Sequence, residues 1–306
     1  MTIYPAYYAP ERVGQLYAPD VAAATQAGFE AKLPPATEDT FRVYLLLVDQ
    51  QVDFIHPDGA LAVPGAIDDT IRIVNWMYAH TDAISAIGAS VDSHIPLQIF
   101  FPTWWVNEAG EHPQPYTAIS SDDVKRGTWQ PLYEQEWSQN YVAQLEQSAK
   151  KQLMIWPYHT LLGTPGHALV PAIYEAIAYH TAARRIQPTI LIKGTLPITE
   201  HYSIMEPEVK IEGNPMGQLN TSLLDVIGQY DLIYVAGQAK SHCVLETLAS
   251  MMRYYPPEII AKIRVLEDAM SSVTHPEIDF DHLANETLAQ FAEQGMKLVK
   301  TSDPIG

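Results

Sequence analysis

The sequence predicts an α/β fold with three layers, in which helices cover both faces of a mostly parallel, twisted β-sheet. Residues 43–48 are a continuous apolar run, which is typical of a strand buried on both faces. Similar runs then alternate along the chain with segments whose apolar residues recur at helical spacing. Such alternation favours parallel strands, because each helix returns the chain to the same end of the sheet. The alternation never resets, so we expect a single domain over residues 41–306.

The elements are predicted in the following order. The strand at 43–48 precedes a helix at 67–80, where Ile67, Ile71, Val74 and Met77 lie at helical spacing. The remaining elements are a strand at 83–91, a helix at 168–183, a strand at 189–192, a helix at 220–227, a strand at 232–236, a helix at 244–252, a strand at 263–267, a helix at 280–293 and a strand at 296–299.

Two segments fall outside this alternation. Residues 1–40 contain five prolines and show no persistent period, so we expect an irregular N-terminal arm that packs on the body or on another subunit. Residues from about 100 to 155 are rich in tryptophan, proline and polar side chains. They are predicted to be an insertion near the carboxyl ends of the strands, where long insertions tend to be lids or binding loops.

Composition excludes several classes of function. The chain has 306 residues, 47% of them apolar, which is enough for a full core. With 18 basic and 36 acidic residues its net charge is −18, which argues against a nucleic acid or an anionic membrane as partner. One cysteine excludes an intrachain disulfide, and no signal peptide or spanning helix stands out, so a cytoplasmic setting is expected. We expect a small-molecule ligand and a homo-oligomer.

Cys243, the single cysteine, lies between the predicted strand 232–236 and the predicted helix 244–252. At a helix N-terminus the unpaired N–H groups and the helix dipole favour a thiolate, as a reactive cysteine requires. The alternative is a small buried side chain without chemistry, since free cysteines are often buried and inert.

Two charged residues also follow predicted strands. Asp49 ends the first strand, where it could serve as general base for a thiol or simply cap the following turn. Lys193 ends the third predicted strand. There it could lower the pKa of a nearby thiol, or it could emerge into water at the strand end.

Asp92 and His94 follow the second predicted strand and suggest a metal site. In an extended chain the side chains of residues i and i+2 point the same way, so both could bind one divalent ion. His159 is a candidate third ligand. One carboxylate and two imidazoles with open water positions fit zinc best, with iron or manganese as alternatives. The carboxyl ends of parallel strands meet at one edge of a sheet, so these residues should gather with Asp49, Lys193 and Cys243.

Four short motifs, in this order, resemble those of the isochorismatase-like cysteine hydrolases, most closely the nicotinamidase branch. They are Asp-x-Gln-x-Asp-Phe at residues 49–54, Trp-Pro-x-His at 156–159 followed by Gly-Thr-Pro-Gly at 163–166, Lys-Gly at 193–194, and Gly-x-Ala-x-x-x-Cys at 237–243. The match runs from about residue 43 to residue 300 and implies an isochorismatase-like, Rossmann-like fold.

The resemblance also implies roles for individual residues. Asp49, Lys193 and Cys243 would be the catalytic triad, and Asp92, His94 and His159 would hold the metal. Phe54 and Trp156 would flank the substrate ring, and Tyr202 lies near a position where nicotinamidases place a pocket tyrosine. The peptide bond between Gln238 and Ala239 would be cis, with the amides of Ala239 and Cys243 forming an oxyanion hole.

The activity implied is hydrolysis of nicotinamide, or a similar aromatic carboxamide, to the acid and ammonia through a thioester on Cys243. Phe100 stands where some nicotinamidases have a further histidine, and the segment between His94 and His159 is longer than in compact members. A related amidohydrolase of another small amide, ureido or carbamoyl compound is therefore an alternative, and a non-catalytic binding protein on this fold is a remote one.

Overall fold

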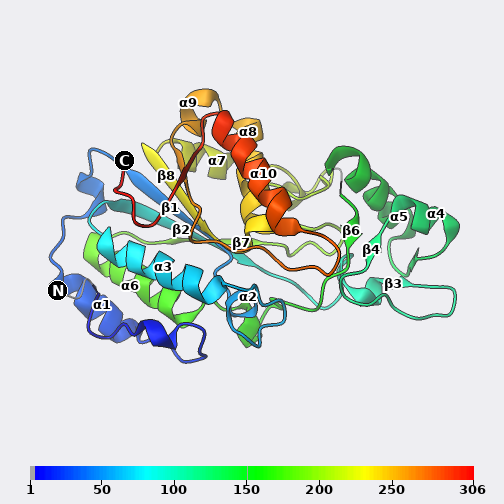
Figure 1. Ribbon diagram of the computed structural model, residues 1–306, viewed down its shortest axis with the longest axis horizontal. Coiled ribbons are helices and arrows are strands. Elements are labelled where there is room, and N and C mark those ends of the chain that lie inside the picture. Colours follow the sequence, from blue (N-terminus) through cyan, green and yellow to red (C-terminus); the bar gives the residue numbers. More distant parts are fainter. Residues whose placement is uncertain (1–3, 150) are drawn as a thin grey trace.

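The centre of the molecule is a six-stranded parallel sheet, seen in a computed structural model that describes residues 4–149 and 151–306 (Figure 1). The strand order is β10-β9-β8-β1-β2-β7, and every neighbouring pair is parallel. The strands are β1 (Val43–Val48), β2 (Ile84–Asp92), β7 (Thr189–Lys193), β8 (Leu232–Gly237), β9 (Ile263–Leu266) and β10 (Lys297–Val299). The predicted three-layer fold is confirmed, and each predicted strand agrees within one residue at either end.

Helices cover both faces of this sheet. One face carries α3 (Ala66–Ala79) and α6 (Pro171–Arg184), and the other carries α7 (Thr221–Gly228), α8 (Leu245–Tyr254) and α10 (Phe280–Glu293) (Figure 1). The short helices α2 (Val52–Ile55) and α9 (Pro257–Ile260) lie in connections. Strand β1 shows why its sequence is apolar throughout. Val43, Leu45 and Leu47 enter the core under α3 and α6, whereas the alternate residues Tyr44, Leu46 and Val48 enter the core under α7 and α8.

The N-terminal segment contains a helix, α1 (Val21–Glu30), so the prediction of an irregular arm is wrong for these ten residues. The five prolines all lie outside the helix, and the Asp20 side chain caps it by accepting a hydrogen bond from the N–H of Ala23. The helix packs on α6 through Gly28, where a Cβ atom would lie 2.4 Å from the carbonyl oxygen of Tyr179. Close packing on the body, and not a local apolar pattern, therefore fixes this helix.

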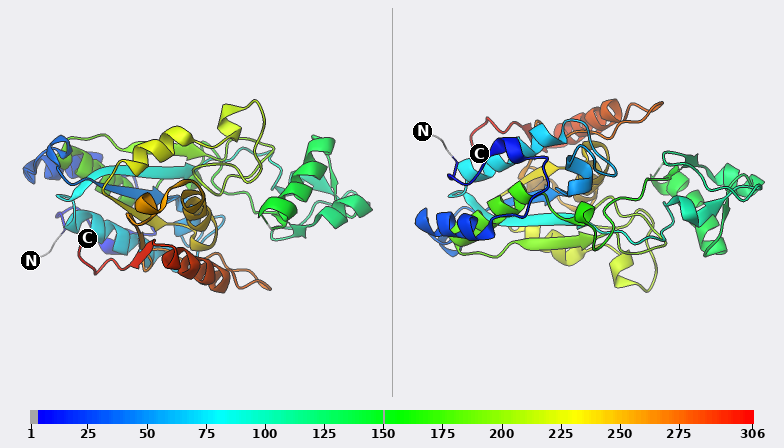
Figure 2. Two further views of the ribbon diagram at one scale, coloured as in Figure 1. Left: turned by 90° about the horizontal axis from the view of Figure 1, so that it is seen from above. Right: turned by 90° about the horizontal axis from the view of Figure 1, so that it is seen from below.

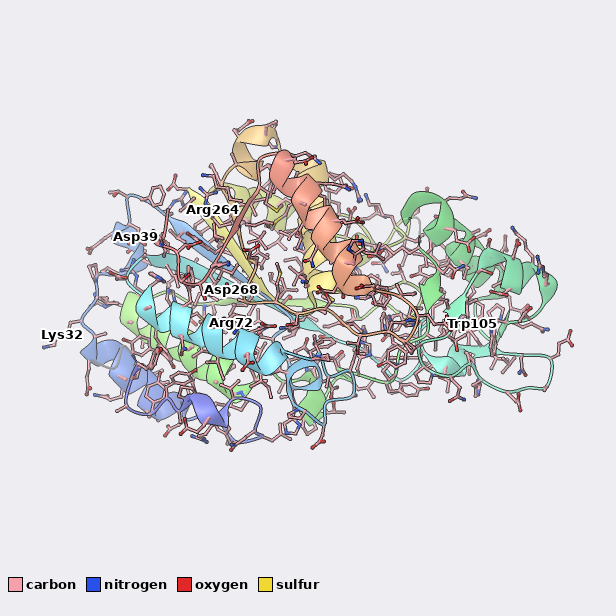
Figure 3. The ribbon with its side chains drawn as sticks, viewed as in Figure 1. Lys32, Asp39, Arg72, Trp105, Arg264 and Asp268 are labelled. Atoms are coloured by element: carbon pink, nitrogen blue, oxygen red, sulfur yellow. The ribbon has the colours of Figure 1, made fainter. Side chains whose placement is uncertain are left out.

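Residues 100–149 and 151–155 form a small lobe, here called the insertion lobe, which projects from the body of the molecule (Figure 2). Its elements are β3 (Trp105–Val106), β4 (Ala118–Ile119), α4 (Ser121–Arg126), β5 (Gln130–Pro131), α5 (Gln135–Gln144) and β6 (Leu153–Met154). β3 pairs with β5 and β4 with β6, both antiparallel. Trp105 is fully buried within the lobe and donates its Nε1–H to the carbonyl oxygen of Ile99, 2.6 Å away (Figure 3).

The connection between β9 and α10 is fixed to the opposite helical layer at its start. Arg72 of α3 donates from Nε to the carbonyl oxygen of Asp268, two residues beyond β9 (Figure 3). The chain then runs through residues 270–279 toward the carboxyl ends of the strands before α10 begins. Within the described ranges, every helix is too short or too polar to cross a membrane.

Acid sensitivity of the fold is expected from His180, a buried residue of α6 whose Nε2–H donates to the carbonyl oxygen of Ile84. Burial lowers the pKa of His180 to about 4, below the value of about 6.5 for an exposed imidazole. Between these two values the unfolded chain binds a proton that the folded chain does not bind. Stability is therefore fully present above pH 6.5 and is lost as the pH falls, by up to about 1.4 kcal/mol per pH unit for this group.

His180→Gln keeps an N–H donor but cannot titrate, so its unfolding free energy should depend less steeply on pH between 6.5 and 4.5. Urea unfolding at several pH values measures the slope, and the exposed His282→Gln serves as control. Equal slopes for His180→Gln and the unaltered protein would show that His180 titrates normally.

Candidate active site

Asp49, Lys193 and Cys243 come together at the carboxyl ends of the strands. The Nζ atom of Lys193 lies 3.0 Å from Asp49 Oδ2 and 3.5 Å from Cys243 Sγ. All three side chains are buried, with exposed fractions of 6% or less. The sequence therefore predicted correctly which side chains meet, although they are separated by up to 194 residues (243 − 49).

The local backbone explains how each of the two acid–base partners is presented. Asp49 follows β1 in a left-handed conformation (φ 45°), which turns its side chain back toward the sheet edge. There Ser90 of β2 donates its hydroxyl to Asp49 Oδ1 at 2.6 Å, and it accepts the Asp49 N–H. Lys193 has a further partner, since its Nζ donates to the carbonyl oxygen of His201 at 2.8 Å. Both charged groups are thus held in one orientation before any ligand binds.

Cys243 lies in a tight turn between β8 and α8. The Gln238–Ala239 peptide bond is cis, in agreement with the prediction, and a π-helical turn (Lys240–Val244) follows it. Gln238 is fully buried and donates its side-chain amide to Asp69 Oδ2, which anchors the turn to α3. The backbone N–H of Ala239 has no acceptor within the described part of the chain. That donor is therefore free to bind a substrate oxygen.

The electrostatics of the triad favour a neutral thiol at rest. Burial raises the pKa of the Cys243 thiol well above its usual range, and the Lys193 charge only partly opposes this. Burial also raises the pKa of Asp49, which makes this carboxylate a stronger base than an exposed one. Burial alone would lower the pKa of Lys193, but the Asp49 and Asp92 carboxylates raise it well above its usual range. Lys193 is therefore a permanent cation beside a thiol and its candidate base.

The three predicted metal ligands also converge. The ligand atoms of Asp92, His94 and His159 all lie within 4.8 Å of one another, and all three residues are buried. The site adjoins the triad, because Asp92 Oδ1 lies 2.9 Å from Lys193 Nζ. Gly194 is needed beside it, since a Cβ atom there would lie 2.6 Å from Asp92 Oδ1 and its φ is +80°.

The hydrogen bonds of the two imidazoles fit a metal ion. His94 Nδ1 lies 3.2 Å from the carbonyl oxygen of Gly194, and His159 Nδ1 lies 2.8 Å from that of Pro157. A carbonyl can only accept, so each ring carries a proton on Nδ1, and in the neutral form that binds a metal the lone pair of Nε2 faces the site. Burial alone would lower the pKa of His94, but the Asp92 carboxylate raises it, so metal binding would displace a proton from this ring. His94 Nε2 is buried 2.8 Å from Asp92 Oδ2, and His159 Nε2 lies 3.8 Å from the same oxygen, so both nitrogens face the carboxylate with which they would share an ion. The group can hold one divalent ion.

Removal of one ligand tests this site directly. The purified protein should contain about one divalent ion per chain, and His94→Ala should lose most of it. Elemental analysis of a freshly prepared, unchelated sample measures the content. His282→Ala, on the exposed face of α10, is the control and should keep the ion. A metal-free sample of the unaltered protein would contradict the metal assignment.

Aromatic side chains form the remaining wall of the site. The Trp156 ring contacts His242 at 5.2 Å between centroids and donates its Nε1–H to the Tyr202 hydroxyl at 2.8 Å. Phe54, by contrast, packs edge-on against the metal-site residue His159, with a centroid distance of 5.7 Å. The predicted ring-binding residues Phe54, Trp156 and Tyr202 thus border the site, and His242 joins them. Burial lowers the pKa of His242 to about 3, so its imidazole is neutral at pH 7.

Sequence reasoning did not assign several residues that hold this site in place. Gln51 donates to the carbonyl oxygen of Asp92 and accepts the Asp92 N–H, which fixes the backbone of that ligand. Asp53 Oδ2 accepts the N–H of Thr160, directly after His159. The motif at residues 49–54 contains both residues, so the signal was present. Ser90 and His242 stand in no such pattern and could not be found this way.

Comparison with known proteins identifies the fold. No family model and no curated protein matches the sequence. Among solved structures, a nicotinamidase/pyrazinamidase from Acinetobacter baumanii superposes with a TM-score of 0.56 at 19% identity, over 87% of this chain and 99% of that one. The fold is that of the nicotinamidases. The yeast nicotinamidase Pnc1p superposes with a TM-score of 0.56 at 22% identity, over 84% of this chain and 99% of its own. PnC1 from L. infantum, solved in complex with nicotinate, superposes with a TM-score of 0.52 at 18% identity, over 86% of this chain and 95% of its own.

Proposed function

We propose that this protein is a metal-containing cysteine amidohydrolase that converts nicotinamide, or a similar aromatic carboxamide, to the acid and ammonia. The position of Lys193 carries the proposal. Its ammonium lies 3.0 Å from Asp49, 2.9 Å from Asp92 and 3.5 Å from Cys243, so one cation joins base, metal site and thiol in a buried cluster. The neighbours with this fold, named as nicotinamidases, support the choice of an amide substrate.

The first half of the reaction forms a thioester. Asp49 takes the thiol proton, Cys243 Sγ attacks the amide carbon, and Lys193 stabilises the negative charge that appears on sulfur. The carbonyl oxygen becomes an oxyanion, for which the free N–H of Ala239 and the N–H of Cys243 are the proposed donors. Each such donor is worth about 2.7–4 kcal/mol in well-studied hydrolases. Protonated Asp49 then gives its proton to the amide nitrogen, the C–N bond breaks and ammonia leaves.

The second half returns the enzyme to its resting state. Water enters where ammonia left, and Asp49 takes a proton from it as the water oxygen attacks the thioester carbon. The C–S bond breaks, the carboxylic acid is released and Cys243 regains the proton from Asp49. The raised pKa of Asp49 suits this alternation, because the group must both accept and donate a proton in each cycle.

A divalent ion held by Asp92, His94 and His159 would supply a Lewis-acidic point that binds a ring nitrogen or a water molecule beside the triad. Zinc fits one carboxylate and two imidazoles best, with iron or manganese as alternatives. Two other residues of the chain keep these ligands in position. Gln51 fixes the backbone of Asp92, and Gly194 leaves room for the side chains of Asp92 and His94.

The aromatic wall favours a flat ring as the rest of the substrate. Trp156, Tyr202 and His242 contact one another edge to face, and His242 directly precedes Cys243, so an aromatic ring could pack against this wall. The second candidate, an amidohydrolase of an aliphatic, ureido or carbamoyl compound, would need polar groups in place of this wall. The convergence of all three triad side chains disfavours a merely binding protein.

A panel of amides assayed for ammonia release tests the proposal. Nicotinamide, pyrazinamide, benzamide, propionamide and a ureido compound are compared by kcat/KM, with Cys243→Ala as the blank. Fastest turnover of an aromatic amide supports the proposal. Fastest turnover of an aliphatic or ureido compound would contradict the proposed substrate class but would leave the proposed hydrolysis mechanism in place. No turnover of any amide by the metal-loaded protein would contradict both.

A further inference from the structure

Six aromatic side chains form a connected group beside Cys243, which directly follows one of them, His242. We call them the aromatic collar: Tyr116, Trp156, Tyr202, His242, His275 and Phe280. Five of the rings form a closed cycle of contacts. The centroid distances around it are 6.0 Å (Tyr116–Trp156), 5.2 Å (Trp156–His242), 4.9 Å (His242–Phe280), 5.6 Å (Phe280–His275) and 6.3 Å (His275–Tyr116). Tyr202 contacts both Trp156 and His242.

The cycle is completed by two segments outside the sheet and its covering helices. Tyr116 belongs to the insertion lobe, and its N–H donates to the carbonyl oxygen of Ile155, next to Trp156. His275 belongs to the connection between β9 and α10, where its Nδ1 accepts the N–H groups of Glu277 and Ile278. The Tyr116 backbone and the His275 ring are thus each held within their own segment, whereas no hydrogen bond between the two residues is present in the described chain. Their contact is the longest in the cycle.

The thiol itself has little contact with solvent. Cys243 is 6% exposed and Trp156 is 2% exposed, whereas Tyr116 is 37% exposed. The rings of the cycle meet edge to face. Tyr116 and His275 make the longest contact of the cycle and come from two different segments, the insertion lobe and the 270–279 connection.

We propose that Tyr116 and His275 determine the specificity of the reaction: substrate enters between them, and they then close on a flat aromatic ring. This rests on the proposed function and defines its substrate class as planar aromatic amides. A flat ring can replace the edge-to-face contacts that it breaks, whereas an aliphatic amide cannot. Water is excluded only when the collar has closed.

The first test measures how accessible the Cys243 thiol is, and it does not depend on amidase activity. Alkylation of Cys243 by iodoacetamide and by the bulkier N-ethylmaleimide is followed by mass spectrometry in Tyr116→Ala and His275→Ala. Both variants should react faster than the unaltered protein, and the gain should be larger for the bulkier reagent. Tyr133→Ala, an exposed tyrosine of the same lobe, is the control and should react at the original rate. Unchanged rates in both collar variants would overturn the proposal.

The second test reads selectivity. The ratio of kcat/KM for nicotinamide to that for propionamide should fall by about three- to tenfold in Tyr116→Ala and in His275→Ala, the size expected for losing one aromatic contact. Tyr133→Ala should keep the ratio. If the collar variants kept the same ratio but were alkylated faster, Tyr116 and His275 would only limit access to the thiol. Their proposed role in selectivity would then be wrong. If the protein hydrolysed no amide, the proposed function would fail while the alkylation result still stood.

Discussion

Lys193→Met should abolish amide hydrolysis and lower the free energy of unfolding by about 3–5 kcal/mol, the cost of removing one partner from a buried ion cluster. Lys193 is the cation between Asp49 and Asp92, whose carboxylates lie 3.0 and 2.9 Å from its Nζ. Methionine has a similar length but no charge, so two carboxylates would face each other in a site closed to water. At least one of them would then bind a proton, and a protonated Asp49 cannot act as base.

Urea unfolding and ammonia release measure the two effects of Lys193→Met. The matched control is Lys125→Met, which removes an exposed lysine that is paired with Asp122 at 3.8 Å on the surface of α4. A surface pair of this kind is worth about 0–1 kcal/mol. Metal-saturated protein is used throughout, so that the charge of a bound ion is the same in each sample. If Lys193→Met kept its stability and most of its activity, the ion cluster would not be the centre of the site.

Cys243→Ala should reduce amide hydrolysis by on the order of 10⁴-fold or more, because Cys243 carries the only thiol of the sequence and the proposed thioester forms on it. The substitution removes a single buried atom, and burial had raised the pKa of that thiol, so no charge is left unpaired. The metal content should therefore stay the same and the stability should change little. Loss of activity with an intact fold and metal is the signature of a missing nucleophile.

Steady-state ammonia release at saturating amide measures the loss of activity in Cys243→Ala. Ser241→Ala, two residues away on the same turn, is the control for local disturbance. Near-normal turnover by Cys243→Ala would show that the thiol is not the nucleophile.

The sheet was predictable because its strands carry their signal locally. Strand β1 has six apolar residues in a row since alternate side chains fill two different cores. The N-terminal helix α1 carries no such signal: its short, alanine-rich sequence is stabilised by the fit of Gly28 against α6, a contact between residues about 150 positions apart (179 − 28 = 151). The strands of the insertion lobe are two residues long, which is too short for any period to appear.

The position of the site could be predicted from the expected strand topology as well as from the motifs. Asp49, Asp92 and Lys193 each end or follow a parallel strand, and Cys243 follows β8, so a sheet of this kind brings them to one edge. Ser90 was invisible because a serine within an apolar strand has no distinctive spacing. The aromatic collar was invisible for another reason: Tyr116 and His275 meet only after two irregular segments have folded across the strand ends.

The central claim is that Cys243 attacks an amide carbon, and trapping the intermediate tests it most directly. Metal-loaded protein is mixed with nicotinamide, quenched in acid within one turnover and digested, and the peptide that contains Cys243 is weighed by mass spectrometry. A nicotinoyl thioester on Cys243 is predicted, absent from Cys243→Ala and accumulating to a smaller extent in Asp49→Asn. Release of ammonia with no acyl group on Cys243 at any time point would contradict the account.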